Sequence, residues 1–127
     1  MDLYKNNMNY DLDLNDRPFK EIKAGTKKIE TRVPTSYDKT PYNEIIVGDT
    51  FTFTNNVTRE TMVVDILGIR HYPDVRTMLE AEGTRNALSS GLDINGAIER
   101  YNTVFEEYKE NIPKFGIYGI EVKPIIN

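Results

Sequence analysis

Alternating apolar and polar side chains in residues 10–14 predict a strand with one buried face near the start of the chain. The next segment, Pro18–Ala24, has a proline that suits a first helical turn and two apolar residues on one helical side. It is predicted to be a short helix that ends at Gly25. Alternation returns in Lys28–Val33, which is predicted to be a second strand.

The middle of the chain predicts a loop followed by two strands. Pro34–Asn43 is rich in turn-forming residues and is long enough to be a mobile flap. Ile45–Thr54 combines an apolar run, a Gly-Asp turn and alternating phenylalanines, a pattern typical of a turn that leads into a barrel strand. Glu60–Tyr72 is rich in β-branched residues and is predicted to be a long central strand, bent near Gly68.

The part of the chain after Tyr72 shows the periodicity of helices. Asp74 is predicted to cap one helix, and Asp93 a longer one in which apolar residues recur at helical spacing from Ile94 to Tyr108. Phe115–Ile126 is predicted to be the closing strand. Successive strands lie close enough in the chain to pair antiparallel. The sequence therefore predicts an α+β fold, a small partly closed antiparallel β-barrel with appended helices.

Length and composition limit the classes of protein to which this chain can belong. The 127 residues predict a single domain over residues 1–127. The absence of cysteine and the single histidine exclude thiolate nucleophiles, Cys/His zinc sites and disulfide frameworks, and no metal or cofactor is predicted. The N-terminus lacks a signal-peptide pattern, and no apolar run approaches the roughly 18 residues of a membrane span. A cytoplasmic protein without membrane attachment is expected.

Charge is distributed unevenly along the chain. The net charge is −4, which argues against general coating of nucleic acid. However, residues 17–39 carry seven basic side chains against three acidic ones, whereas residues 74–110 carry eight acidic against four basic. One face of the protein is therefore expected to attract an anion although the whole molecule is acidic.

The densest candidate for chemistry is the segment GTKKIETR, residues 25–32. In a regular strand Lys28, Glu30 and Arg32 share one face. Lys27 precedes the strand alternation and can point toward the same mouth as Glu30. From the residues alone, this face is more typical of a solvent-exposed ladder of ion pairs than of a binding site.

The segment resembles the signature of the ASCH family, a branch of the PUA-like fold, which reads G-x-K-x-x-E-x-R just after a short helix. PFKEIKA before it, VGDTFTF after it and IRHYPDVRTMLEAEG farther on also resemble parts of that family. The resemblance implies a small β-barrel with Lys27, Glu30 and Arg32 in a cleft, and an RNA-related role. Arg32 would then contact a phosphate or a base edge, Lys27 would supply a point charge, and Glu30 would accept from an exocyclic amine or hold Arg32.

Some proteins similar to this family hydrolyse acetylated cytidine with a lysine, a hydroxyl nucleophile and a more distant glutamate. That branch has a threonine at the position of Glu30, so the present sequence departs from it. If the chain is an enzyme, which the sequence leaves open, Lys27 and Glu30 are its catalytic candidates. Thr31 is expected on the opposite strand face, and Glu80 or Glu82 is either the acidic partner or an ordinary helix residue.

Several aromatic side chains are further candidates for binding RNA, a nucleotide or a modified nucleoside. Tyr37 and Tyr42 lie in the loop after the charged segment and are predicted to stack on bases, or else to pack on the barrel rim. Tyr72 is a weaker stacking candidate, and His71 is either a ligand contact or a structural residue. Tyr101, Phe105 and Tyr108 have helical spacing and are predicted to be core. A third possible function is a protein-interaction module that uses the acidic helical face of residues 99–110.

Overall fold

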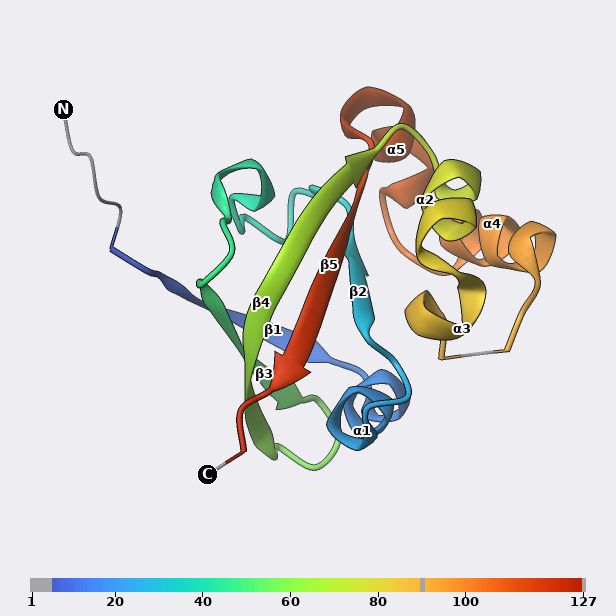
Figure 1. Ribbon diagram of the computed structural model, residues 1–127. Helices are drawn as coiled ribbons and strands as arrows, with labels where there is room; N and C mark the ends of the chain where they lie inside the picture. Colours follow the sequence, from blue (N-terminus) through green and yellow to red (C-terminus); the bar gives the residue numbers. More distant parts are fainter. Residues whose placement is uncertain (1–5, 90, 127) are drawn as a thin grey trace, which may run out of the picture.

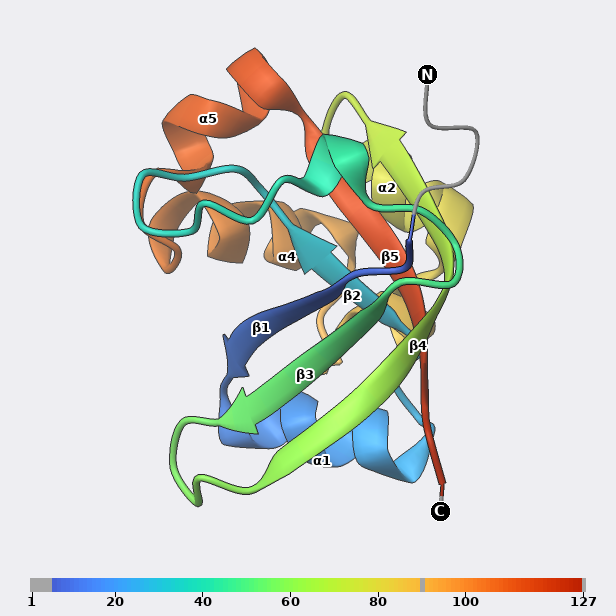
Figure 2. The same cartoon turned by 90° about the vertical axis from the view of Figure 1, so that its left-hand side faces the viewer.

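The computed structural model describes residues 6–89 and 91–126, in which five strands form one strongly curled sheet with helices on its outside and at one end (Figures 1 and 2). In chain order the elements are β1 (Asn9–Leu14), α1 (Asp16–Ala24), β2 (Ile29–Arg32), η1 (Tyr42–Glu44), β3 (Thr50–Asn55), β4 (Thr61–Tyr72), α2 (Val75–Glu82), α3 (Thr84–Ala87), α4 (Ile94–Thr103), α5 (Tyr108–Phe115) and β5 (Ile117–Pro124). The predicted α+β half-barrel with appended helices is confirmed.

The strands are ordered β1-β3-β4-β5-β2 across the sheet. The prediction that all neighbouring strands pair antiparallel is wrong at one place, because β1 runs parallel to β3. After β1 the chain passes through α1 to β2 at the other edge of the sheet, and it returns by a long loop to lie beside β1 in the same direction. Such a crossover is what parallel pairing requires. As a result β1 and β2 are the two edge strands, and the sheet does not close between them.

The inside of the curled sheet forms one hydrophobic core. Phe51 and Phe53 of β3 are fully buried there, as are Val64 and Ile66 of β4. Helix α1 closes one end of the half-barrel (Figure 2), and its residues Phe19 and Ile22 belong to the same cluster. The alternation of burial along β3 and β4 is the two-residue period expected for strands with one face in the core.

A second hydrophobic core lies between the outer face of the sheet and the C-terminal helices. Ile29 of β2 and Ile117 of β5 pack in it against buried side chains of α2, α4 and α5, including Met78, Tyr101 and Ile112. Strand β2 is therefore covered on both faces, which differs from a barrel strand with one solvent face. This double burial places β2 at the junction of the two layers.

The helix predicted over residues 94–108 is two helices. Helix α4 ends at Thr103, and α5 begins at Tyr108 after Glu107, whose φ of 69° is left-handed. The Glu107 carboxylate accepts hydrogen bonds from the amide and the hydroxyl of Ser36, which hold the break against the loop after β2. The closing strand begins at Ile117 rather than Phe115. Because of the break, the acidic residues 99–110 do not form a single helical face.

Within the described residues, no helix has both the length and the apolar composition needed to span a membrane.

Candidate functional site

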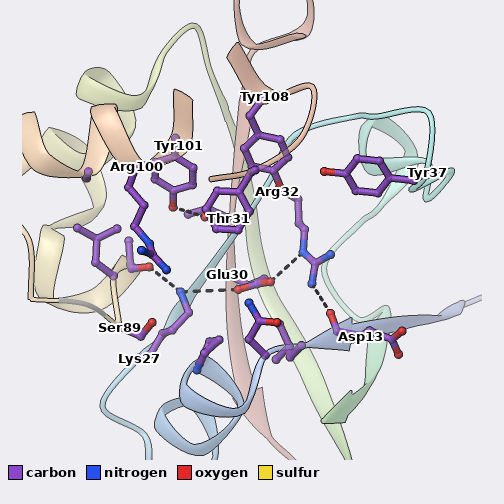
Figure 3. Close-up of a pocket in the computed structure, with 17 residues that line it drawn as sticks. Asp13, Lys27, Glu30, Thr31, Arg32, Tyr37, Ser89, Arg100, Tyr101 and Tyr108 are labelled. Carbon is purple, nitrogen blue, oxygen red and sulfur yellow. Dashed lines mark hydrogen bonds and ion pairs between the residues drawn. The ribbon is translucent and has the colours of Figure 1, made fainter. Parts of the chain in front are cut away.

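A cavity of about 320 Å³ lies between the free edge of β2, the end of β1 and the helices α3, α4 and α5 (Figure 3). Charged side chains line one part of it and aromatic side chains another. The charged residues are Asp13, Lys27, Glu30, Arg32 and Arg100, and the aromatic residues are Tyr37, Tyr101, Phe105 and Tyr108. The cavity volume is at the lower end of the range for small-molecule sites, about 300–1,000 Å³.

The position of the cavity follows from the open seam of the sheet. The Arg32 guanidinium crosses this seam, where Nη2 donates to the Asp13 main-chain oxygen of β1 at 3.0 Å. Glu30 and Arg32 face the β1 side of β2, whereas the Thr31 hydroxyl lies on the helical side, 2.6 Å from the Tyr101 hydroxyl. The predicted opposite orientation of Thr31 is confirmed. Thr31 nevertheless lines the cavity, because the cavity lies at the free edge of β2 and reaches side chains from both faces of this strand.

Glu30 lies between two cations (Figure 3). Its Oε1 is 3.7 Å from Lys27 Nζ, and its Oε2 is 2.8 Å from Arg32 Nε. The side chains of Lys27, Glu30 and Arg32 are only 5%, 8% and 15% exposed. The interpretation of this face as a solvent-exposed ladder of ion pairs is therefore wrong. The three groups form a buried row of alternating charge beside the cavity.

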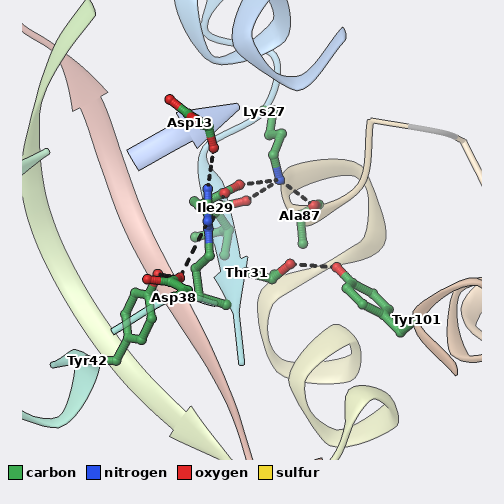
Figure 4. A network of polar contacts seen from close by, with 10 residues as sticks. Asp13, Lys27, Ile29, Thr31, Asp38, Tyr42, Ala87 and Tyr101 are labelled. Carbon is green, nitrogen blue, oxygen red and sulfur yellow. Dashed lines mark hydrogen bonds and ion pairs between the residues drawn. The ribbon is translucent and has the colours of Figure 1, made fainter. Parts of the chain in front are cut away.

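Lys27 makes two hydrogen bonds and one ion pair. Nζ donates to the main-chain oxygens of Ile29 at 2.5 Å and Ala87 at 2.6 Å (Figure 4), and it forms an ion pair with Glu30 at 3.7 Å. Burial lowers the pKa of Lys27 from its ordinary value, and the negative charge of Glu30 acts in the opposite direction. Three acceptors match the three donors of an ammonium group. In this protonated form the Lys27 amine has no lone pair for a nucleophile or a general base.

Arg32 is held as a cation. Burial is the strongest single influence and acts to lower its pKa, but the charges of Glu30, Asp38 and the nearby tyrosines Tyr42 and Tyr108 together outweigh burial, and the pKa is raised above its ordinary value. The Asp38 carboxylate adds a second contact, with Oδ2 at 3.7 Å from Arg32 Nη1. Asp38 in turn accepts a hydrogen bond from the Tyr42 hydroxyl at 2.5 Å. The loop predicted to be a mobile flap is thus attached to the charged row through Asp38.

The aromatic wall comes from both sides of the break between α4 and α5. The Phe105 ring is 5.5 Å from that of Tyr101 and 5.0 Å from that of Tyr108. Burial raises the pKa of the Tyr101 hydroxyl to about 12, so this phenol is neutral at physiological pH. The sequence predicted these three residues only as core. The helix break also brings them to the cavity, where Phe105 is half-buried.

The main chain of β2 adds polar groups at its free edge. The Val122 amide donates to the Lys28 carbonyl, which fixes the groups of β2 that face β5. Because main-chain groups alternate along a strand, the N–H and C=O of Thr31 point to the opposite, unpaired edge. The Ile29 carbonyl at this edge already accepts from Lys27. Thr31 therefore presents one donor and one acceptor toward the cavity side.

The structure brings together only some of the residues proposed from the sequence. Tyr37 lines the cavity and is 57% exposed, and its hydroxyl donates to the Glu106 carbonyl at 2.8 Å. Lys28 is exposed and lies outside the cavity. Tyr42 is 2% exposed and stacks on Tyr118 in the barrel core, so the prediction that it stacks on a base is wrong. A loop tyrosine is equally able to fill the core.

His71 and Tyr72 also lie away from the cavity, at the end of β4. The His71 ring is 4.7 Å from that of Tyr118, and its Nε2 is 2.6 Å from the Phe115 carbonyl. The Tyr72 hydroxyl donates to Glu82 Oε2 at 2.5 Å. Their prediction as ligand contacts of this site is wrong, because β4 is separated from β2 by β5 in the sheet.

Glu82 is not an acidic partner of Lys27. It accepts two hydrogen bonds from Arg70, at 2.6 Å and 2.9 Å, and one from Tyr72. Glu80 is exposed on α2, and neither glutamate lines the cavity. Arg100 and Ser89, which do line it, carry no sequence signal that separates them from other polar residues of the helical region.

The Glu82 contacts predict acid-sensitive stability. Burial raises the pKa of Glu82, but the hydrogen bonds from Arg70 and Tyr72 outweigh burial and hold the pKa below its ordinary value of 4.5. Ionised Glu82 therefore stabilises the fold above pH 4.5, and this stabilisation is lost as the pH falls through the lower folded-state pKa. We expect Glu82→Gln to reduce the free energy of unfolding by roughly 1–2 kcal/mol at pH 7, and by less at pH 3.

Urea unfolding at both pH values measures this difference. The matched variant Glu80→Gln is expected to stay within about 0.5 kcal/mol of the wild type at either pH. An equal loss for Glu82→Gln at pH 7 and pH 3 would contradict the assignment.

Among the described residues no group of three His, Asp or Glu side chains gathers closely enough to hold a metal ion.

Comparison with known proteins matches the fold and the family of the chain. The sequence model of the ASCH domain matches residues 12–126. The crystal structure of hypothetical protein PH0355 shares 32% identity with a TM-score of 0.77, and the match covers 93% of this chain and 100% of that one. The solution NMR structure of protein PF0455 from Pyrococcus furiosus shares 32% identity with a TM-score of 0.69, over 94% and 100% of the two chains. No curated protein matches the chain.

Proposed function

Because this chain belongs to the ASCH domain family, we propose that its cavity binds a nucleotide or a segment of RNA, with one nucleobase between the aromatic wall and the charged row. The observation that carries the proposal is the buried row Lys27, Glu30 and Arg32 beside an aromatic cavity. Buried ion pairs contribute little net stability compared with apolar residues of the same volume. Ligand recognition gives these charges a function that stability alone does not.

The aromatic wall supports stacking of a base. Phe105 is half-buried and Tyr37 is exposed, so each has ring surface that a ligand can cover. Stacking of a nucleobase on an aromatic side chain contributes about 1–3 kcal/mol and tolerates any base. This contact supplies affinity, whereas selection among bases has to come from hydrogen bonds.

Hydrogen-bonding capacity remains at the charged row. An ionised carboxylate has about four lone-pair positions, and Glu30 uses its two oxygens for Lys27 and Arg32. It therefore retains capacity to accept from an exocyclic amine such as that of cytosine or adenine. The main-chain N–H and C=O of Thr31 offer a further donor and acceptor. Together these groups support recognition of a base edge.

Binding without bond cleavage has the better support. A hydrolase that uses Lys27 requires a free lone pair on Nζ, and three acceptors surround this amine. The Thr31 hydroxyl is paired with Tyr101 rather than with Lys27. An acidic docking helix has less support still, since residues 99–110 are interrupted and Glu107 binds Ser36.

Titration with nucleosides tests the proposal. We expect at least one of adenosine, cytidine, guanosine and uridine to shift the amide NMR signals of Thr31 and Tyr101, because both residues line the cavity. Phe105→Ala is expected to weaken that binding by about 1–3 kcal/mol through lost stacking. N4-acetylcytidine is included in the series, and we expect it to be recovered without conversion to cytidine.

The matched control is Phe115→Ala, which removes a 51% exposed ring outside the cavity. Its nucleoside affinity is expected to equal that of the wild type. Equal weakening by the two variants, or signal shifts confined to residues far from the cavity, would contradict the proposed site.

A further inference from the structure

A second hollow, of about 420 Å³, lies beside the nucleobase cavity, between α1 and the region of α3. Arg17 of α1 and Arg85 of α3 line it, together with the Thr84 side chain. Leu88 and Ser89 line both hollows, so the two share a wall. A ligand that extends past this wall from the cavity therefore enters the second hollow.

Three arginines follow this path and have charge available for an anion. Within the described part of the chain, Arg85 and Arg100 are exposed and have no ion-pair partner. Arg17 is 64% exposed, and its Nε is 3.6 Å from Glu21 Oε1, a separation that leaves the guanidinium free to bind another acceptor. Arg100 points toward Lys27 and Ser89 at the mouth of the cavity (Figure 3).

Lysines of α1 differ from these arginines. Lys20 is paired with Asp16 and Lys23 with Glu60, and neither lysine lines a hollow. Their charges are already compensated, although the sequence places them in the same basic segment. Among the basic residues of α1, Arg17 is therefore the one that lines a hollow.

The charge balance of the two hollows is opposite to that of the whole chain. Their walls carry five basic side chains, Lys27, Arg32, Arg100, Arg17 and Arg85, against three acidic ones, Asp13, Glu30 and Glu21. The chain as a whole has a net charge of −4. The negative charge of the whole protein opposes general attraction to polyanions. The local positive charge of the two hollows instead favours binding of an anionic ligand at this site.

Resting on the proposed function, we propose that the second hollow binds the phosphodiester backbone of single-stranded RNA through Arg17 and Arg85, with Arg100 at the shared wall. The ligand is then an oligonucleotide that places one base in the cavity and adjacent phosphates on the arginines. Guanidinium groups suit this task because their planar donors match phosphate oxygens. The hydroxyls of Thr84 and Ser89 lie along the same path and supply neutral donors.

Affinity as a function of ligand length tests this inference. The probes are adenosine, cytidine and uridine, and the corresponding homohexaribonucleotides, titrated at about 0.1 M salt. We expect the hexamer of the preferred base to bind at least tenfold more tightly than its nucleoside. Arg85→Ala is expected to weaken binding of the hexamer about fivefold and to leave the affinity for the nucleoside unchanged. The slope of log affinity against log salt concentration is expected to fall by the amount that corresponds to about one phosphate contact.

The matched control is Lys123→Ala, which removes an exposed charge of β5 outside both hollows. It is expected to leave the affinity for the hexamer unchanged. If a nucleoside binds in the cavity but the hexamer binds no more tightly, or if Lys123→Ala weakens the hexamer as much as Arg85→Ala, the phosphate path is wrong and the nucleobase site stands. If neither nucleoside nor hexamer binds, both proposals fail.

Discussion

Glu30→Ala is expected to lower the free energy of unfolding by about 3–5 kcal/mol, the usual cost of removing one partner from a buried ion pair. Glu30 is the only described carboxylate within ion-pair distance of Lys27, and it is the nearer of two at Arg32. Without it, two largely buried cations face each other across an empty position. Urea unfolding at pH 7 measures the loss.

Two further variants separate this effect from a general loss of acidic charge. Glu99→Ala removes an exposed carboxylate of α4 and is expected to change stability by less than about 0.5 kcal/mol. Adding Lys27→Met to Glu30→Ala removes one of the uncompensated cations, so the double variant is expected to cost less than the sum of the two single variants. A loss below about 1 kcal/mol for Glu30→Ala would show that the buried row contributes little to the fold.

Sequence patterns predicted where the strands lie in the chain better than they predicted which strands pair in the sheet. The alternation of Phe51 and Phe53 correctly identified a strand with one buried face, and the same holds for Leu12 and Leu14. Alternation reports which side chains are buried and carries no information on the adjacent strand. The parallel pairing of β1 with β3 depends instead on the crossover through α1 and β2.

The helix break shows a different limit of sequence patterns. Helical spacing continues from Tyr101 through Phe105 to Tyr108 because residues on both sides of the break pack against the same hydrophobic core. Glutamate is not a residue that signals a left-handed φ. The conformation of Glu107 depends on its tertiary contacts with Ser36, which lies 71 positions earlier in the chain.

For the candidate site, the resemblance of residues 25–32 to a known family predicted Lys27, Glu30 and Arg32 as cleft residues, whereas their burial was not predictable. A strand face with three charges is usually exposed. Here the seam is covered by neighbouring elements, and the two cations find acceptors in distant parts of the chain, Ala87 for Lys27 and Asp13 for Arg32. The aromatic wall was missed because helical spacing is the same for a core residue and for one that also lines a cavity.

Arg32→Ala is expected to weaken the preferred nucleoside or RNA by about 1–3 kcal/mol, and to reduce discrimination among bases. Arg32 lines the cavity and is fixed by Glu30 and Asp13, so its remaining donors have a defined direction. Isothermal titration with each base measures both effects. Lys114→Ala removes an exposed charge of α5 outside the cavity and is expected to leave affinity and discrimination unchanged.

The most direct test of a structured recognition site is the RNA affinity of folded Glu30→Gln, with folding verified by its NMR spectrum. Removing a negative charge from a basic surface strengthens binding that is purely electrostatic. In the proposed site, by contrast, Glu30 orients Lys27 and Arg32 and accepts a hydrogen bond from the base. We therefore predict weaker binding of the preferred RNA by Glu30→Gln, whereas tighter binding to every RNA tested would contradict the site and indicate a basic patch without specific recognition.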